Sequence, residues 1–182
     1  MLTTARLLIT PLTYPQLVTY LQADNALEAQ IGLAKEQRVV DQGFREMMEK
    51  FALPSMNTTS PANHIFFTCW IVVDKASNRI VAELGFKGPP NAQGEIEIGY
   101  DTLEGHQRKG YMTEAVGALI DWAGTQSQVR AVLAETEHSN LASIRVVQKN
   151  GFKQFDQKGT MLWWRKALDQ GSGSIQAVAG FQ

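Results

Sequence analysis

The sequence predicts a mixed α/β (α+β) domain with a mostly antiparallel sheet of about seven strands and helices on its faces. Two patterns carry this prediction. Three strand-like segments, 64–73, 80–86 and 94–102, follow one another with short connections, which is typical of an antiparallel meander. An amphipathic helix and a further strand, 129–136, come next. Such a strand–helix–strand unit makes its two strands parallel and its crossover right-handed.

Composition limits the classes of protein to which the chain can belong. Its 182 residues are enough for one domain with its own core. An apolar fraction of 44% and a net charge of −1 are ordinary for a soluble globular protein and give no overall attraction to nucleic acid or membrane. Residues 1–15 lack a signal-peptide pattern and no apolar run reaches membrane-span length, so we expect a cytoplasmic protein. The single cysteine, Cys69, allows no internal disulfide and no thiolate metal cluster, and we expect it to be buried.

The N-terminal part of the chain is expected to be a strand followed by helices. Residues 5–12 read as a strand that Pro11 ends, and 13–23 as a helix with Thr13 as its N-cap. Apolar residues recur at helical spacing over 33–53, which predicts a second helical region whose Met and Phe side chains pack in the core or line a pocket. The next ten residues have the composition of a loop, either a surface connection or a mobile segment beside a substrate.

The later elements follow from turn and cap signals. Residues 74–79 predict a hairpin turn, and 87–93, with two prolines, a longer connection. Residues 139–150 read as a helix that Ser139 or Asn140 caps. Gly151 is expected to end that helix. Two short strands, 152–156 and 160–166, then close the chain, and Trp163 and Trp164 on the second strand should point to opposite faces of the sheet. The single domain is expected to span 1–168, followed by a Gly/Ser-rich tail over 169–182.

A glycine turn in segment 105–115 opens directly into the amphipathic helix, which is expected to run to about Ser127. The unpaired amides and the macrodipole of a helix start attract anions. Arg108 and Lys109 at this positive end should cost a few tenths of a kcal/mol each, which a docked polyanion would offset. The alternative is that Gly110 is a plain turn glycine beside two solvated charges, and the turn alone does not decide between the two readings.

Three stretches together resemble the GNAT family of acyl-CoA N-acyltransferases, and within it the branch of ribosomal-protein N-terminal acetyltransferases. Residues 107–112 match the family's acyl-CoA loop, Q/R-x-x-G-x-G/A, with methionine at its last position. Residues 140–152 match N-x-x-S-x-x-V-x-x-K-x-G-F, and residues 6–9 resemble the opening R-L-x-L strand of this branch. The order of elements fits over residues 5–168.

The resemblance implies a splayed pair of parallel strands, ending near Thr102 and Thr136, that holds acetyl-CoA as cosubstrate without a metal. Backbone amides of the loop would bind the CoA pyrophosphate, and Asn140 would bind the pantetheine arm, although Asn140 and Ser143 could equally cap their helix. The implied cofactor-binding residues are Leu103, Gln107, Arg108, Lys109, Gly110, Tyr111, Met112, Thr113, Asn140 and Ser143.

The implied reaction is direct attack of a primary amine, a protein N-terminus or a small molecule, on the thioester. An alkylammonium has a pKa of about 10.4, so a base is needed. We rank Glu97 first, because buried neighbours would raise its pKa, then Glu135, then His138, with Glu137 also near. Ser143 is a candidate to protonate the thiolate. The acyl group is expected to be acetyl.

One departure from the family pattern supports a second hypothesis. Val147 stands where many members carry the tyrosine that protonates the leaving thiolate. The alternative is therefore a CoA-binding sensor or structural module without transfer activity. In either case the expected partners are acetyl-CoA and, for the enzyme, an amine, with no nucleic acid and no membrane; a homodimer is a further option.

Overall fold

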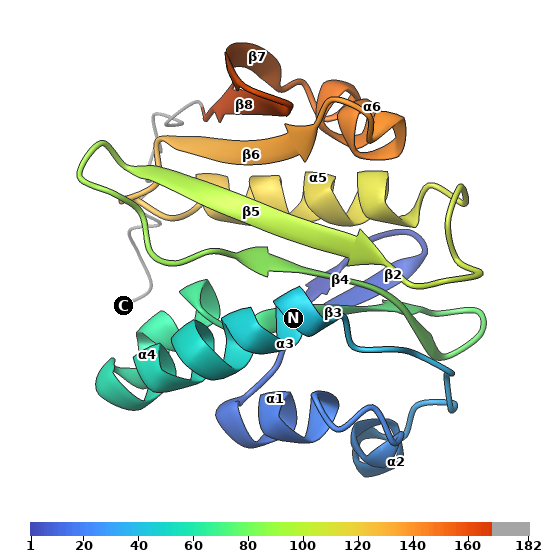
Figure 1. Ribbon diagram of the computed structural model, residues 1–182. Coiled ribbons are helices and arrows are strands. Elements are labelled where there is room, and N and C mark those ends of the chain that lie inside the picture. Colours follow the sequence, from blue (N-terminus) through green and yellow to red (C-terminus); the bar gives the residue numbers. More distant parts are fainter. Residues whose placement is uncertain (169–182) are drawn as a thin grey trace, which may run out of the picture.

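A single sheet of eight strands organises the fold, which the computed structural model describes for residues 1–168 (Figure 1). The strand order is β1-β2-β3-β4-β5-β6-β8-β7, and only β5 and β6 pair in parallel. This confirms the mixed, mostly antiparallel fold class. The strands are β1 (Leu2–Thr3), β2 (Leu7–Pro11), β3 (Cys69–Asp74), β4 (Arg79–Phe86), β5 (Glu95–Thr102), β6 (Ala131–Glu137), β7 (Lys153–Lys158) and β8 (Met161–Ala167).

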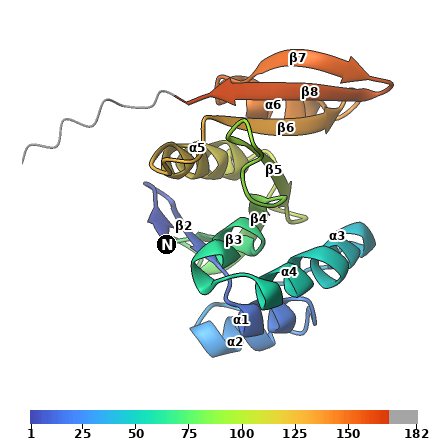
Figure 2. The ribbon, with the colours of Figure 1, turned by 90° about the vertical axis from the view of Figure 1, so that its left-hand side faces the viewer.

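Helices cover both faces of the sheet (Figures 1 and 2). α5 packs against β1, β2, β4 and β5, and its predicted apolar face is buried. α1 to α4 lie on the opposite face, where Tyr20 of α1 reaches Glu83 of β4. The helical elements are α1 (Tyr14–Tyr20), α2 (Ala26–Ile31), α3 (Gln42–Met47), a π-helical turn (Met48–Ala52), α4 (Leu53–Thr58), a 3₁₀ helix (Pro61–Phe66), α5 (Tyr111–Gly124) and α6 (Leu141–Lys149).

The parallel pair of strands separates half-way along its length. Glu95–Ile98 of β5 pairs with Ala131–Ala134 of β6. Beyond Ile98, β5 continues to Thr102 beside β4 only, and beyond Ala134, β6 continues to Glu137 beside β8 only. The splayed strands expected from the resemblance are therefore present.

The segment between α2 and β3 differs from the sequence expectation. Instead of a helix over 33–53 and a loop over 54–63, helical structure begins at Gln42, capped by Asp41, and continues to Thr58 through the π turn. Proline inside a helix removes a hydrogen bond and crowds the preceding turn. A π turn directly before Pro54 widens the helix at that point, so the proline does not end it. The loop assigned to 54–63 was therefore wrong over 54–58, and also over 61–63, which begin the 3₁₀ helix.

The first central strand starts later than predicted. Residues 64–66 belong to the 3₁₀ helix that starts at Pro61, and β3 begins at Cys69. The ring of Pro61 fixes its φ near the helical value, which favours a helical turn over a strand at this point. Two short elements, α2 and β1, were not predicted, because each is too short to show a periodicity of its own.

Several local predictions are confirmed. Thr13 caps α1 in a capping box with Gln16, and Asn140 caps α6. Gly151 ends α6 with φ of 76°. The side chain of Trp164 is buried and donates from Nε1 to Thr136 Oγ1 at 2.8 Å, whereas that of Trp163 is half-exposed.

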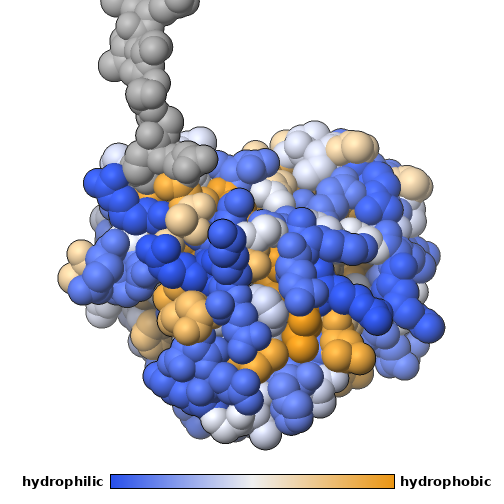
Figure 3. All heavy atoms as spheres, turned by 90° about the horizontal axis from the view of Figure 1, so that it is seen from above, coloured by the Kyte–Doolittle hydropathy of each residue, from blue (hydrophilic) through white to orange (hydrophobic). Residues whose placement is uncertain are grey.

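Among residues 1–168, no helix combines the length and the apolarity that a bilayer crossing needs. The surface seen from the side of β7, β8 and α6 is mostly hydrophilic, with small apolar groups between charged side chains (Figure 3). The predicted tail, 169–182, lies outside the described residues.

Candidate active site

The glycine turn before α5 has an unusual backbone. Gly110 is the N-cap with φ of 79°, and no side chain caps the helix. Arg108 also has a positive φ, 63°, a conformation that costs a non-glycine residue about 1 kcal/mol or more. The turn leaves the start of a 14-residue helix without a capping side chain. That arrangement suits an anion at the helix N-terminus.

Arg6, the residue directly before β2, contacts this turn through its side chain. Its Nη1 donates to the Lys109 carbonyl oxygen at 3.0 Å, and its Nε pairs with Glu114 Oε2 at 2.7 Å. The guanidinium also lies 5.1 Å from the centre of the Tyr111 ring. The side chains of Arg108 and Lys109 are exposed and form no ion pair with any residue in the described part of the chain. Both therefore remain available for an anion.

Asn140, Ser143 and Tyr100 meet at the start of α6. Asn140 Oδ1 accepts from the Ser143 amide at 3.0 Å, which is a capping bond. The hydroxyls of Ser143 and Tyr100 are 2.8 Å apart. Burial raises the pKa of Tyr100, and the bond to Ser143 opposes this effect. Val147, at the position of the family tyrosine, is fully buried and carries no hydroxyl. The hydroxyl of Tyr100 from β5 instead reaches the start of the same helix, a contact that the sequence did not predict.

The first two candidates for the base share one cation. Lys87 Nζ pairs with Glu97 Oε1 and lies 3.8 Å from Glu135 Oε2. The Glu97 side chain keeps 24% of its surface exposed and points away from its buried neighbours Ile96 and Ile98 on the strand. The structure therefore brings Glu97 and Glu135 close to each other. The Lys87 ammonium lies beside both carboxylates, whereas the sequence predicted an apolar environment for Glu97.

The remaining two candidate bases are Glu137, the last residue of β6, and His138, the residue after it. Glu137 is exposed. His138 is exposed too, and its Nδ1 is 3.3 Å from the Thr160 carbonyl oxygen. Neither lines the two hollows described below.

A cavity of about 440 Å³ lies between α3, the π turn and strands β4 and β5. It reaches Gly99, Tyr100 and Asp101, the first residues of β5 after its pairing with β6 ends. The Met and Phe side chains expected to lie in the core or in a pocket do line it in part. Its lining consists of Asp41, Gly43, Phe44, Met47, Met48, Thr68, Cys69, Glu83, Leu84, Gly85, Phe86, Lys87, Gly99, Tyr100 and Asp101. A second hollow, about 570 Å³ and without any carboxylate in its lining, lies at the other end of β5 near Pro89.

Glu83 is the titratable group of this cavity that sequence reasoning missed. Burial raises its pKa from the ordinary value to about 7. The Tyr20 hydroxyl donates to Glu83 Oε2 at 2.5 Å and opposes that shift. Burial also raises the pKa of the Cys69 thiol, which leaves Cys69 protonated and poorly nucleophilic. A carboxylate with a pKa near neutrality can accept a proton and release it again at physiological pH.

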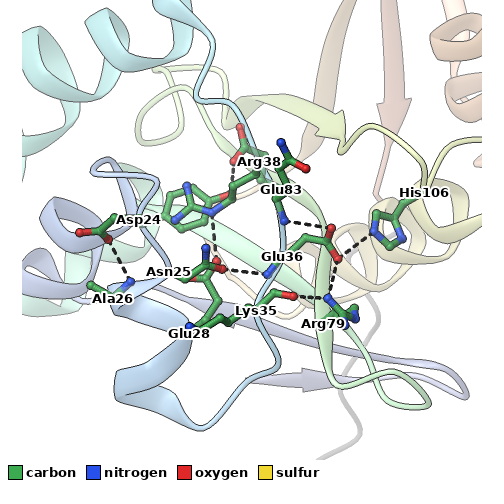
Figure 4. A network of polar contacts seen from close by, with 12 residues as sticks. Asp24, Asn25, Ala26, Glu28, Lys35, Glu36, Arg38, Arg79, Glu83 and His106 are labelled. Atoms are coloured by element: carbon green, nitrogen blue, oxygen red, sulfur yellow. Dashed lines mark hydrogen bonds and ion pairs between the residues drawn. The ribbon is translucent and has the colours of Figure 1, made fainter.

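Arg38 and Glu28 form a buried ion pair (Figure 4), and Arg38 lies against the Tyr20 ring. Arg38 stacks over the Tyr20 ring at 3.8 Å, and its Nε pairs with Glu28 Oε1 at 3.1 Å. Both side chains are almost completely buried, with 2% and 0% exposed. The Tyr20 ring is therefore fixed between the sheet and a cation, which fixes the direction of its hydroxyl.

The segment that carries Arg38 also contacts the approach to the glycine turn. Glu36 Oε2 lies 3.2 Å from His106 Nε2 and 3.5 Å from Arg79 Nη1 (Figure 4). The connection between α2 and α3 is thus tied to the loop between β5 and α5.

Comparison with known families decides the identity of this arrangement. The sequence model described as "Acetyltransferase (GNAT) domain" matches residues 6–153. The chain belongs to the GNAT acetyltransferase family. The family match covers the splayed strands, the glycine turn and α6, so the GNAT identity applies to the candidate site itself.

Individual relatives of this GNAT chain are similar in part. An uncharacterized N-acetyltransferase of Bacillus subtilis, YjdG, is 44% identical over 86 residues, which are 47% of this chain and 51% of the relative. The similarity therefore spans about half the length of that protein.

Solved structures show the same fold over nearly the whole chain. RimL, a ribosomal L7/L12 α-N-protein acetyltransferase in complex with coenzyme A, has a TM-score of 0.64 at 16% identity, covering 92% of this chain and 97% of RimL. Spermidine N-acetyltransferase from Vibrio cholerae, in complex with CoA and spermine, has a TM-score of 0.60 at 13% identity, covering 92% of this chain and 98% of that one.

Proposed function

We propose that the chain is an N-acetyltransferase that moves an acetyl group from acetyl-CoA to a primary amine by direct attack. One observation carries the proposal. The cavity that contains Glu83 also contains residues 99–101, the part of β5 that has left β6. A donor held between the separated strands and an amine held in the cavity would meet there, beside a carboxylate whose pKa is about 7.

On the donor side, the amides at the start of α5 would hold the pyrophosphate, with Arg108 and Lys109 as cations beside it. The pantetheine would pair with the open backbone edge of β5 up to Leu103. Gln107, Tyr111, Met112 and Thr113 complete the proposed loop. Asn140 and Ser143 would contact the pantetheine arm, and the capping bond uses only the Asn140 side-chain oxygen.

On the acceptor side, Glu83 is the base that we favour over Glu97 and Glu135. The ammonium of the amine loses a proton to the Glu83 carboxylate, directly or through water. The amine nitrogen then forms a bond to the thioester carbon, and the C–S bond breaks. The nitrogen gives up its second proton to solvent. The thiolate takes a proton from Ser143 while Ser143 takes one from Tyr100 in the same step, and Tyr100 then recovers its proton from solvent. Ser143 and Tyr100 would thereby protonate the thiolate in place of the family tyrosine, whose position is occupied by Val147.

Thiol release tests the proposal against a CoA-binding module without transfer activity. Acetyl-CoA binding is measured by calorimetry, and free thiol is measured with a panel of primary amines. Saturable binding together with amine-dependent thiol release is expected. Binding without release by any amine would favour the sensor or structural module.

Alanine at Gly110 is expected to weaken acetyl-CoA binding by about tenfold. The φ of 79° costs an alanine about 1–2 kcal/mol, and relaxation of the turn would misdirect the amides at the start of α5. Gly159, with φ of 60° in the open turn between β7 and β8, is a matched control, because alanine there meets the same backbone cost far from the turn. Calorimetry on both variants checks this. Equal affinities for Gly110→Ala and Gly159→Ala would contradict the role of the turn.

Phenylalanine at Tyr20 is expected to move the acidic limb of the kcat/KM profile to higher pH. The Tyr20 hydroxyl lowers the pKa of Glu83, so its loss raises that pKa above about 7, and the base is active only when ionised. A hydrogen bond to a charged group is worth about 1.5–3 kcal/mol, so the shift should be about one unit or more. Tyr14→Phe, on the same helix but bonded only to Asn57, is the control. An unchanged limb in Tyr20→Phe would exclude Glu83 as the titrating base.

A further inference from the structure

We infer that the acceptor is a compact amine with a single positive charge and an apolar body, taken up in the cavity between α3 and strands β4 and β5. This inference rests on the proposed function and specifies the substrate class that the same site accepts. Three features of the cavity carry it: carboxylates without a directly paired cation, an apolar wall, and a far end whose carboxylates are already paired with Lys87.

The carboxylates of the cavity have no directly paired cation. Burial raises the pKa of Glu83, and Arg38 opposes that rise from the far side of the Tyr20 ring. Asp41 and Asp101 are exposed to solvent. Glu83 and Asp101 stand directly opposite each other on β4 and β5, a cross-strand arrangement of like charges that destabilises a sheet. Asp41, from the N-cap of α3, lines the same cavity. Within residues 1–168, none of these three carboxylates forms an ion pair with Lys or Arg. A bound ammonium would relieve this repulsion.

Each carboxylate also keeps acceptor capacity. Asp41 Oδ1 accepts from the Phe44 amide at 3.0 Å, and Asp101 Oδ1 accepts from the Thr102 amide at 2.8 Å. Glu83 accepts from Tyr20 through Oε2. The second oxygen of each group has no hydrogen bond within the described part of the chain. Partial burial and the charge of Asp41 raise the pKa of Asp101, and the hydrogen bond from the Thr102 amide only partly opposes them.

The wall that faces these carboxylates is apolar and adaptable. Phe44, Met47 and Met48 from α3 and the π turn line it. Methionine side chains fill irregular space and adjust to a ligand's shape. A volume of about 440 Å³ lies within the range of small-molecule sites. An amine with an apolar body therefore matches both sides of the cavity.

The strands beside the cavity disfavour a peptide acceptor. Peptides commonly bind by adding a strand to an open sheet edge. At the cavity β4 pairs with β3 on one side and β5 on the other, so it presents no edge. The free edge of β5 faces the gap toward β6, where the proposed donor lies.

The far end of the cavity disfavours a second positive charge. Lys87 lines it, with its ammonium held by Glu97 and close to Glu135. The two carboxylates there are already paired with Lys87, so a polyamine extending from Glu83 toward Phe86 would have to displace that lysine to pair its next ammonium. One positive charge is therefore preferred.

The test compares kcat/KM for three acceptors, namely 2-phenylethylamine, spermidine and a tetrapeptide with a free N-terminus, on the full chain with saturating acetyl-CoA. We expect 2-phenylethylamine to exceed both others by at least tenfold. Phe44→Ala and the isosteric Asp101→Asn should each raise its KM by at least tenfold. Phe155→Ala, at an exposed position on β7, is the matched control and should change nothing.

The outcomes separate this inference from the proposed function. Tenfold preference for spermidine or for the tetrapeptide would overturn the inference, while thiol release would still support acetyl transfer. An unchanged KM in both Phe44→Ala and Asp101→Asn would also overturn it. No thiol release with any of the three amines, despite saturable acetyl-CoA binding, would overturn the proposed function together with the inference.

Discussion

Glutamine at Glu83 is expected to lower kcat/KM for acetyl transfer by roughly 10²–10⁴-fold, the range for loss of a general base. The substitution keeps the shape of the side chain and its contact with Tyr20, but an amide cannot accept the proton of an ammonium. Acetyl-CoA affinity should stay the same, because Glu83 lies on the acceptor side of β5. Steady-state kinetics with calorimetry on the same preparations measures both quantities.

Two further glutamine variants make that result specific. Glu46→Gln, on α3 and in an exposed pair with Lys50 of the π turn, should keep full activity. Glu97→Gln tests the competing base, whose carboxylate is paired with Lys87. A large loss in Glu97→Gln with little loss in Glu83→Gln would transfer the role of base to Glu97.

Alanine at Arg38 is expected to reduce the free energy of unfolding by about 3–5 kcal/mol, the usual cost of leaving one buried charge without its partner. Glu28 is fully buried, and its Oε2 has no hydrogen-bond partner within residues 1–168. Two nitrogens of Arg38, Nη1 and Nη2, likewise have none. Because these buried atoms lack hydrogen bonds, the Arg38–Glu28 pair adds little net stability. Removing one partner is nevertheless costly, since it leaves the other charge buried and unpaired. Urea unfolding of the variant measures the loss.

The double variant Glu28→Leu/Arg38→Met separates charge from packing. Replacing both buried charges by apolar groups of similar size is often neutral or stabilising, so the double variant should unfold close to the wild type. Lys50→Ala, at the exposed pair with Glu46, should change stability little. A loss below about 1 kcal/mol in Arg38→Ala would contradict the cost assigned to the buried Glu28 carboxylate without its partner.

Order and periodicity were sufficient to predict the sheet, its parallel pair and α5, whereas the splaying of that pair was expected only from the resemblance to the GNAT family. The helix through Pro54 was missed, because a polar, proline-containing stretch looks like a loop until a π turn accommodates it. Local composition could not predict the contact that matters most at the site. Tyr20 and Glu83 are 63 positions apart, and only the fold brings them together.

The ranking of candidate bases shows the same limit. Glu97 was placed first because its sequence neighbours are apolar, but those side chains point to the other face of β5. Glu83 also follows an apolar run, from Ile80 to Ala82, and this was a usable signal. What singles it out is its burial under α1 and its position across from Asp101. Both features are properties of tertiary packing.

The separation of β5 from β6 has a mechanical consequence. Only the four pairs from Glu95 with Ala131 to Ile98 with Ala134 join the five strands β1 to β5 to the three strands β6, β8 and β7. The sheet therefore consists of two parts that share backbone hydrogen bonds at one end only. At the other end the two parts meet through side chains, where the hydroxyls of Tyr100 and Ser143 lie 2.8 Å apart. A molecule bound between the separated strands would supply main-chain contacts at that end, as an additional strand would.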